Sequence, residues 1–129
     1  MEEHQEEKHM TTDFGKWVLK TCIDKNTTAK EIAEAIDVSA MEISFIIRGK
    51  RQSGVIEAEI KRYLESLPDA CKMSEFEREM RYKLIDHDIK LSELAKILGI
   101  SRAAIYYAVA GKAGYDNIRK KMVAYIDKM

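Results

Sequence analysis

The stretch KLSELAKILGISRAAIYYAVAGKA, residues 90–113, decides the fold of this chain. Ala95 supplies a small side chain at a point where two helices can cross closely. Gly99 suits the positive φ of a tight turn, and Ser101 suits the cap of a following helix. Ile105 and Ala108 have the spacing that turns their side chains back toward the first helix. The stretch therefore predicts a helix, a tight turn and a second helix packed on the first.

An earlier stretch, TAKEIAEAIDVSAMEISFIIRGKR at residues 28–51, has the same pattern. The equivalent positions hold Ala33, Asp37, Ser39, Ile43 and Ile46. The glycine is replaced by an aspartate, which tolerates the left-handed conformation better than most residues. Residues 13–67 align with residues 75–129 without a gap, so that residue i matches residue i + 62. This repeat predicts a duplicated structural unit.

Each unit is predicted to consist of helices only, because no stretch alternates with the period of two that strands require. Three Ser or Thr residues precede a Glu by three positions, which is typical of a capping box at a helix start. These pairs are Thr28–Glu31, Ser39–Glu42 and Ser74–Glu77. The predicted fold class is all-α, a tandem duplication of a small four- or five-helix bundle.

The only proline, Pro68, lies where a boundary between the units is expected. We therefore divide the chain into an acidic tail over residues 1–11, a first domain over 12–67, a linker over 68–73 and a second domain over 74–129. The tail is polar and lacks the apolar run of a signal peptide, so we expect it to be disordered.

Charge is unevenly distributed along the chain. The 22 Lys and Arg balance the 22 Asp and Glu, and a net charge of zero does not by itself favour a nucleic-acid binder. Residues 72–129, however, carry 12 basic against 8 acidic side chains, whereas residues 13–67 carry 9 of each. The second unit is therefore the basic one.

The two cysteines, Cys22 and Cys71, lie far apart and form no C-x-x-C pair, so we expect two reduced thiols. No apolar run approaches the length of a membrane span. These features predict a cytoplasmic protein without membrane contact.

Residues 28–51 and 90–113 resemble the lambda-repressor-like, or Cro/XRE-type, helix-turn-helix family. The family pattern E-L-A…G-[IV]-S…I…G-[KR] fits both units, and the resemblance covers nearly all of residues 12–129. It implies small all-helical bundles and a sequence-specific transcription regulator of the repressor type. It also implies double-stranded DNA as the partner, association with the nucleoid, and a phage or other mobile element as the source.

In such a motif the second helix reads the bases. Arg pairs with guanine edges, and small or aromatic surfaces meet the thymine methyl group. The residues that the second unit would present are Ser101, Arg102, Ala103, Tyr106 and Tyr107. Phosphate contacts are expected from flanking residues. These are Lys90, Ser92 and Lys112 in the second unit, and Arg48, Lys50 and Arg51 in the first.

Two departures from the family pattern favour the second unit as the stronger reader. Many family members have Gln where this chain has Ala29 and Leu91, and neither of these can support a phosphate or base contact. The first unit also presents Met41, Glu42 and Phe45 on its second helix, where a carboxylate would repel phosphate. The first unit is therefore open to either DNA or a protein partner.

Several side chains have two interpretations. Tyr106 and Tyr107 are as compatible with packing on the last helix or on a partner subunit as with DNA contact. The run Arg119-Lys120-Lys121 is more typical of a solvated helix face than of a phosphate clamp. Trp17 fits a docking surface and partial burial against the neighbouring domain equally well.

We expect no catalytic residues, metal or cofactor, and thus no enzyme. His4, His9 and His87 lack metal-ligand spacing with the cysteines, and no Gly-rich phosphate loop is present. The alternative function is a phage-type inhibitor or adaptor that binds protein and has lost DNA reading. The acidic tail and the zero net charge favour it, and the basic second unit opposes it. The two joined units are compatible with a built-in pseudo-dimer and with a homodimer of the whole chain.

Overall fold

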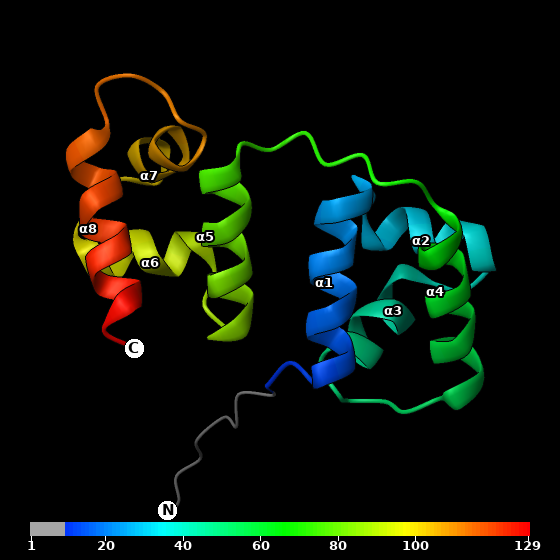
Figure 1. The fold of residues 1–129 in the computed structure, drawn as a ribbon. Helices are drawn as coiled ribbons and strands as arrows, with labels where there is room; N and C mark the ends of the chain where they lie inside the picture. Colours follow the sequence, from blue (N-terminus) through cyan, green and yellow to red (C-terminus); the bar gives the residue numbers. More distant parts are fainter. Residues whose placement is uncertain (1–9) are drawn as a thin grey trace, which may run out of the picture. The chain divides into compact units, whose positions relative to one another are not determined.

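The computed structural model describes residues 10–129, so the predicted disorder of residues 1–11 falls almost entirely outside the described residues. Within that range the chain is all-α, with eight helices and no strand, as the sequence predicts (Figure 1). No helix in the described part of the chain has the length and apolar character needed to cross a membrane.

The chain forms two compact units that divide between Ala70 and Cys71, inside the predicted linker. We call them unit 1 and unit 2. Unit 1 contains α1 (Asp13–Lys25), α2 (Ala29–Ile36), α3 (Ala40–Ile47) and α4 (Gly54–Ser66). Unit 2 contains α5 (Glu75–Asp86), α6 (Leu91–Leu98), α7 (Arg102–Val109) and α8 (Asp116–Asp127).

The helix starts and turns of unit 2 recur 62 residues after those of unit 1. The first residues of α1 to α4 pair in this way with those of α5 to α8. Left-handed backbone conformations recur at the same offset. These pairs are Asn26 with Asp88, Asp37 with Gly99, and Gly49 with Gly111. The correspondence seen in the sequence therefore extends to the caps and turns that shape the backbone.

The predicted capping residues begin their helices. Thr28 and Glu31 make a complete capping box, in which each side chain accepts a hydrogen bond from the other residue's backbone N–H at 3.2 Å. Ser39 caps α3 by accepting from the backbone N–H of Glu42 at 3.1 Å, while the Glu42 carboxylate pairs with Arg51.

The cap of α5 is built in the same way as that of α3. Ser74 accepts from the backbone N–H of Glu77 at 3.1 Å, and the Glu77 carboxylate pairs with Arg81 at 3.0 Å. At Ser39 and Ser74 the serine half of the predicted capping box is therefore formed. The glutamate of each box instead places its carboxylate in an ion pair with an arginine.

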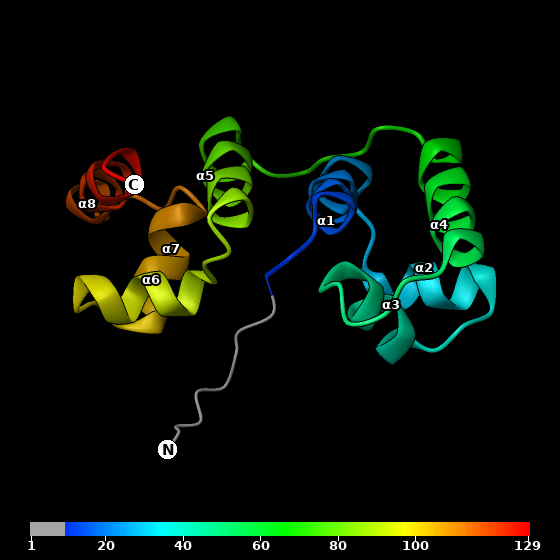
Figure 2. The same ribbon diagram turned by 90° about the horizontal axis from the view of Figure 1, so that it is seen from below.

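Each unit has its own hydrophobic core. In unit 2, α6 packs on α7 and both contact α8, and in unit 1, α2 packs on α3 and α4 (Figures 1 and 2). The predicted core residues Ile43, Ile46, Ile105 and Ala108 are all buried. Both predicted crossing residues are buried as well, Ala33 and Ala95 being 3% and 1% exposed.

The first half of the predicted linker is attached to the end of α1. The Lys25 ammonium donates to the Leu67 carbonyl at 2.7 Å and pairs with Asp69 at 3.1 Å. The backbone N–H of Ala70 donates to the Asp24 carbonyl at 2.8 Å. These contacts extend unit 1 through Ala70, because the last turn of a helix offers unpaired carbonyl groups.

Candidate nucleic-acid interface

The turn between α6 and α7 sets the position of the candidate reading helix. Gly99 adopts φ 68°, and the N–H of Ile100 donates to the Ala95 carbonyl at 2.9 Å. The Ser101 hydroxyl oxygen then accepts from the backbone N–H of Ala104 at 3.1 Å. These local bonds end α6 and start α7 within three residues, so that Arg102 is the first residue of α7.

One face of α7 is exposed and the other is buried. Arg102, Ala103, Tyr106 and Tyr107 are exposed, and the two tyrosines are 42% and 43% exposed. Positions 102 and 106, and positions 103 and 107, are four residues apart and lie together on one side of a helix. The structure therefore brings the predicted base-reading residues onto one accessible surface.

An aromatic and cationic cluster follows α7. The Lys112 ammonium lies 4.8 Å from the Tyr107 ring centroid, within the range of a cation–π contact. The Tyr107 ring also contacts Tyr115, with the centroids 5.6 Å apart. Tyr107 is thus partly packed against the start of α8 and partly exposed. Its position is compatible with both interpretations given above, packing within the unit and contact with DNA.

The start of α6 supplies the remaining predicted residues of unit 2. Lys90 is the N-cap residue and is exposed, and its backbone N–H donates to the Glu93 carboxylate at 2.8 Å. Ser92, in the first turn, is half-buried. Lys90 is therefore the more accessible of these two predicted phosphate contacts.

Sequence reasoning missed the role of Arg119. We expected the run 119–121 to form a solvated helix face, but only Lys120 and Lys121 are exposed. The Arg119 guanidinium is half-buried and donates to the Ala108 carbonyl at 3.0 Å and to the Lys112 carbonyl at 3.1 Å. For this residue the prediction is wrong, because the end of α7 offers carbonyl acceptors within reach of α8.

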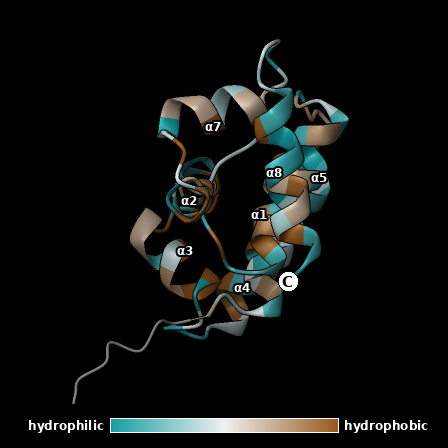
Figure 3. Cartoon of the chain, turned by 90° about the vertical axis from the view of Figure 1, so that its left-hand side faces the viewer, coloured by the Kyte–Doolittle hydropathy of each residue, from teal (hydrophilic) through white to brown (hydrophobic). Residues whose placement is uncertain are grey.

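Unit 1 presents a different surface at the equivalent helix. On α3, Met41 is 64% exposed and Phe45 is 37% exposed. Hydropathy colouring shows α3 mostly in neutral to hydrophobic colours (Figure 3). The aromatic–lysine pair recurs, however, since the Lys50 ammonium lies 5.7 Å from the Phe45 ring centroid.

The electrostatics of α3 also differ from the sequence-based expectation. The Glu42 carboxylate, expected to repel phosphate, lies 2.7 Å from the Arg51 guanidinium. Arg51, predicted as a phosphate contact, is thus engaged in an ion pair, while Arg48 and Lys50 are exposed. The pair partly neutralises both groups, so Arg48 and Lys50 are the better placed cations of unit 1.

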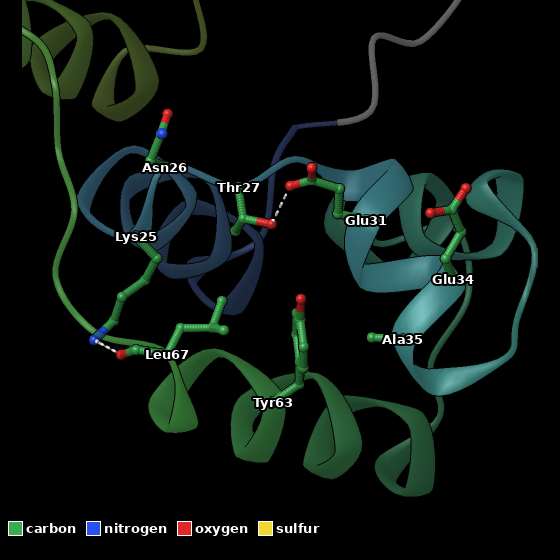
Figure 4. A pocket seen from close by; sticks show the side chains of 8 residues that line it. All are labelled: Lys25, Asn26, Thr27, Glu31, Glu34, Ala35, Tyr63 and Leu67. Atoms are coloured by element: carbon green, nitrogen blue, oxygen red, sulfur yellow. Dashed lines mark hydrogen bonds between the residues drawn. The ribbon is translucent and has the colours of Figure 1, made fainter.

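A shallow hollow of about 500 Å³ lies elsewhere in unit 1, between the end of α1, α2 and α4 (Figure 4). Three of its polar side chains, Lys25, Thr27 and Glu31, are engaged in hydrogen bonds. Thr27 donates to Glu31 at 2.7 Å, and Lys25 is held by the Leu67 carbonyl. None of the predicted DNA-contacting residues lines this hollow.

Comparison with protein-family models, with curated proteins and with solved structures finds no match to this chain. The resemblance to a helix-turn-helix family therefore rests on the sequence pattern of residues 28–51 and 90–113.

Proposed function

We propose that this chain is a sequence-specific DNA-binding transcription regulator built from two tandem lambda-repressor-like helix-turn-helix units, with unit 2 as the stronger reader. The observation that carries the proposal is the exposed face of α7. It begins with an arginine, continues with Ala103 and two tyrosines, and ends beside Lys112. A helix with this face fits the major groove, which admits one α-helix.

The residues divide into reading and anchoring groups. The Arg102 guanidinium would pair with a guanine edge, while Ala103 and Tyr106 would meet a thymine methyl group. Lys90 and Lys112 would anchor phosphates on either side. The Ser101 oxygen is used as the helix cap, but its hydroxyl proton remains available to a phosphate oxygen.

Charge supports the assignment of unit 2 as the reader. Residues 72–129 carry four more basic than acidic side chains, namely 12 against 8. Each phosphate neutralised by a Lys or Arg releases bound counterions, so a basic unit gains affinity that falls with salt. The first turn of α7 contains Arg102, whereas the first turn of α3 contains Glu42.

The test is to select duplexes from genomic fragments with the purified protein at two salt concentrations, and then to titrate the best duplex. We expect Arg102→Ala to weaken specific binding by about 1–3 kcal/mol and to relax preference at one base position. Lys112→Ala should weaken binding to all sequences alike. It should also reduce the salt slope, the steepness with which log affinity falls with log salt concentration, by roughly one. Met41→Ala serves as the matched control on the equivalent helix of unit 1, and it should bind as the parent does.

Parental binding by the Arg102 and Lys112 variants, together with failure of Met41 or Phe45 variants, would move the reading role to unit 1. A second candidate is a protein-binding adaptor, favoured by the exposed Met41 and Phe45 on α3. Weak binding that is blind to sequence in the parent protein would replace the regulator with this adaptor.

A further inference from the structure

Arg119 of α8 connects three parts of unit 2. Its guanidinium donates to the Ala108 carbonyl in the last turn of α7 and to the Lys112 carbonyl in the α7–α8 loop. It also pairs with Asp116 in the first turn of α8. These three partners occupy both terminal nitrogens of the guanidinium, so Arg119 faces its own fold and is poorly placed to contact a phosphate.

The Lys112 backbone is held on both sides, and Arg119 supplies one of the two bonds. Its N–H donates to the Tyr107 carbonyl at 3.0 Å, and its carbonyl accepts from Arg119 at 3.1 Å. Gly111 and Gly114, on either side of it, adopt φ 89° and 91°. Glycine has more conformational freedom to lose than any other residue, so a loop with two glycines needs external bonds to hold one conformation.

Unit 1 cannot make the same bonds. The residue equivalent to Arg119 is Glu57, whose carboxylate has no proton to donate to a carbonyl when ionised. The aromatic–lysine pair is present in both units. At the position of Arg119, however, only unit 2 has a side chain that can donate to the carbonyl of that lysine. The arginine therefore accompanies the unit whose helix carries Arg102.

We propose that Arg119 is a positioning residue for DNA binding, which holds the α7–α8 loop so that the Lys112 ammonium is presented at the edge of the α7 surface. This inference rests on the proposed function, because it concerns how that surface is organised. Arg119 acts through Lys112 and makes no DNA contact of its own.

The test compares Arg119→Met with Lys120→Met, which removes the same charge from the neighbouring exposed position. Arg119→Met should lower affinity for the selected duplex about 5-fold or more and reduce the salt slope by roughly one, as Lys112→Ala does. Lys120→Met should remain within about 2-fold of the parent. Arg119→Lys keeps the charge, but a single ammonium does not reproduce the planar fork, so it should behave as Arg119→Met does.

A double-mutant cycle separates positioning from direct contact. Arg119→Met combined with Lys112→Ala should bind as Lys112→Ala alone does, because the first residue acts through the second. Hydrogen exchange of the Lys112 amide in the free protein should also be faster in Arg119→Met and unchanged in Lys120→Met.

Additive effects in the cycle would assign Arg119 a direct DNA contact and overturn the proposal. Parental affinity and parental exchange in both Arg119 variants would overturn it too. Faster exchange with parental affinity would leave the proposed function standing and reject the positioning role. Absence of sequence-dependent binding in the parent protein would instead reject the proposed function, and the positioning role with it.

Discussion

Gly15 of α1 lies against the end of α3, and replacing it with alanine is the sharpest test of how unit 1 packs. A Cβ atom at this position would lie 2.1 Å from the Ile47 carbonyl oxygen and 2.9 Å from the Thr11 side chain. Carbon and oxygen atoms in close contact are about 3.3–3.6 Å apart. The two helices would therefore have to separate by more than about 1 Å to accept one methyl group.

The separation would also break the bonds that hold the start of α1. The Ile47 carbonyl accepts from the Thr12 N–H at 3.2 Å and from the Thr12 hydroxyl at 3.3 Å. Overpacking costs about 1–3 kcal/mol, and each lost bond adds about 1 kcal/mol. The higher helix propensity of Ala offsets about 1 kcal/mol. We expect Gly15→Ala to lower the free energy of unfolding of unit 1 by about 2–4 kcal/mol.

Urea unfolding followed by tryptophan fluorescence measures this change directly. Trp17, the only tryptophan of the chain, stacks on Phe14 beside Gly15 and therefore reports on unit 1. Gly54→Ala is the matched control, since nothing lies within 4 Å of a Cβ atom at Gly54. It should raise the stability by about 0.4–1 kcal/mol. Equal unfolding midpoints for the two variants would refute the close approach of α1 and α3.

Three further predictions follow from burial and charge. Ala95→Leu and Ala33→Leu should each lower the stability of their own unit by about 1–3 kcal/mol, because both alanines are buried where the motif helices meet; unchanged thermal midpoints in both variants would contradict this. Glu42→Ala should release Arg51 and tighten DNA binding with a steeper salt slope, while leaving stability within about 1 kcal/mol, as expected for a surface ion pair; weaker binding would show that the pair organises the surface. Burial, and secondarily the Glu31 charge, raises the pKa of the Cys22 thiol from 9.0 to about 11. At pH 8 the thiolate fraction of Cys22 should therefore be about 100-fold smaller in the folded chain than in the unfolded chain. Alkylation of Cys22 should be correspondingly slow until urea unfolds unit 1 or the pH approaches 11, and equal rates in the folded and unfolded chains would argue against burial.

The sequence predicted those features of the fold that depend on near neighbours along the chain. Caps such as Ser39 and Ser101 bond to the backbone three residues ahead, and the left-handed turn at Gly99 follows from one residue type. Core positions follow from helical periodicity, as the burial of Ile43 and Ile105 illustrates. Such features leave a pattern in the order of residues, and this is why the 24-residue stretch, its repeat and the lack of strand periodicity were sufficient to predict an all-α fold.

The contacts that sequence reasoning missed join side chains on one element to groups on another. Arg119 meets a carbonyl 11 residues earlier, and Arg51, beyond the end of α3, meets the carboxylate of Glu42 in the first turn of that helix. Their partners depend on how a loop returns to a helix, and no periodic pattern records that path. A run of basic residues predicts a solvated face on average, so a single member that turns inward cannot be recognised from the run.

The two units share an aromatic–lysine pair and differ at the start of the second motif helix. Phe45 with Lys50 and Tyr107 with Lys112 place a lysine over an aromatic ring at equivalent positions. At the start of the helix, by contrast, Ala40 takes the place of Arg102. A lysine contributes affinity without sequence information, whereas an arginine at a base edge contributes discrimination. Under the proposed function, a duplicated chain of this kind would divide its work, with unit 1 adding salt-sensitive affinity or a protein contact while unit 2 selects the site.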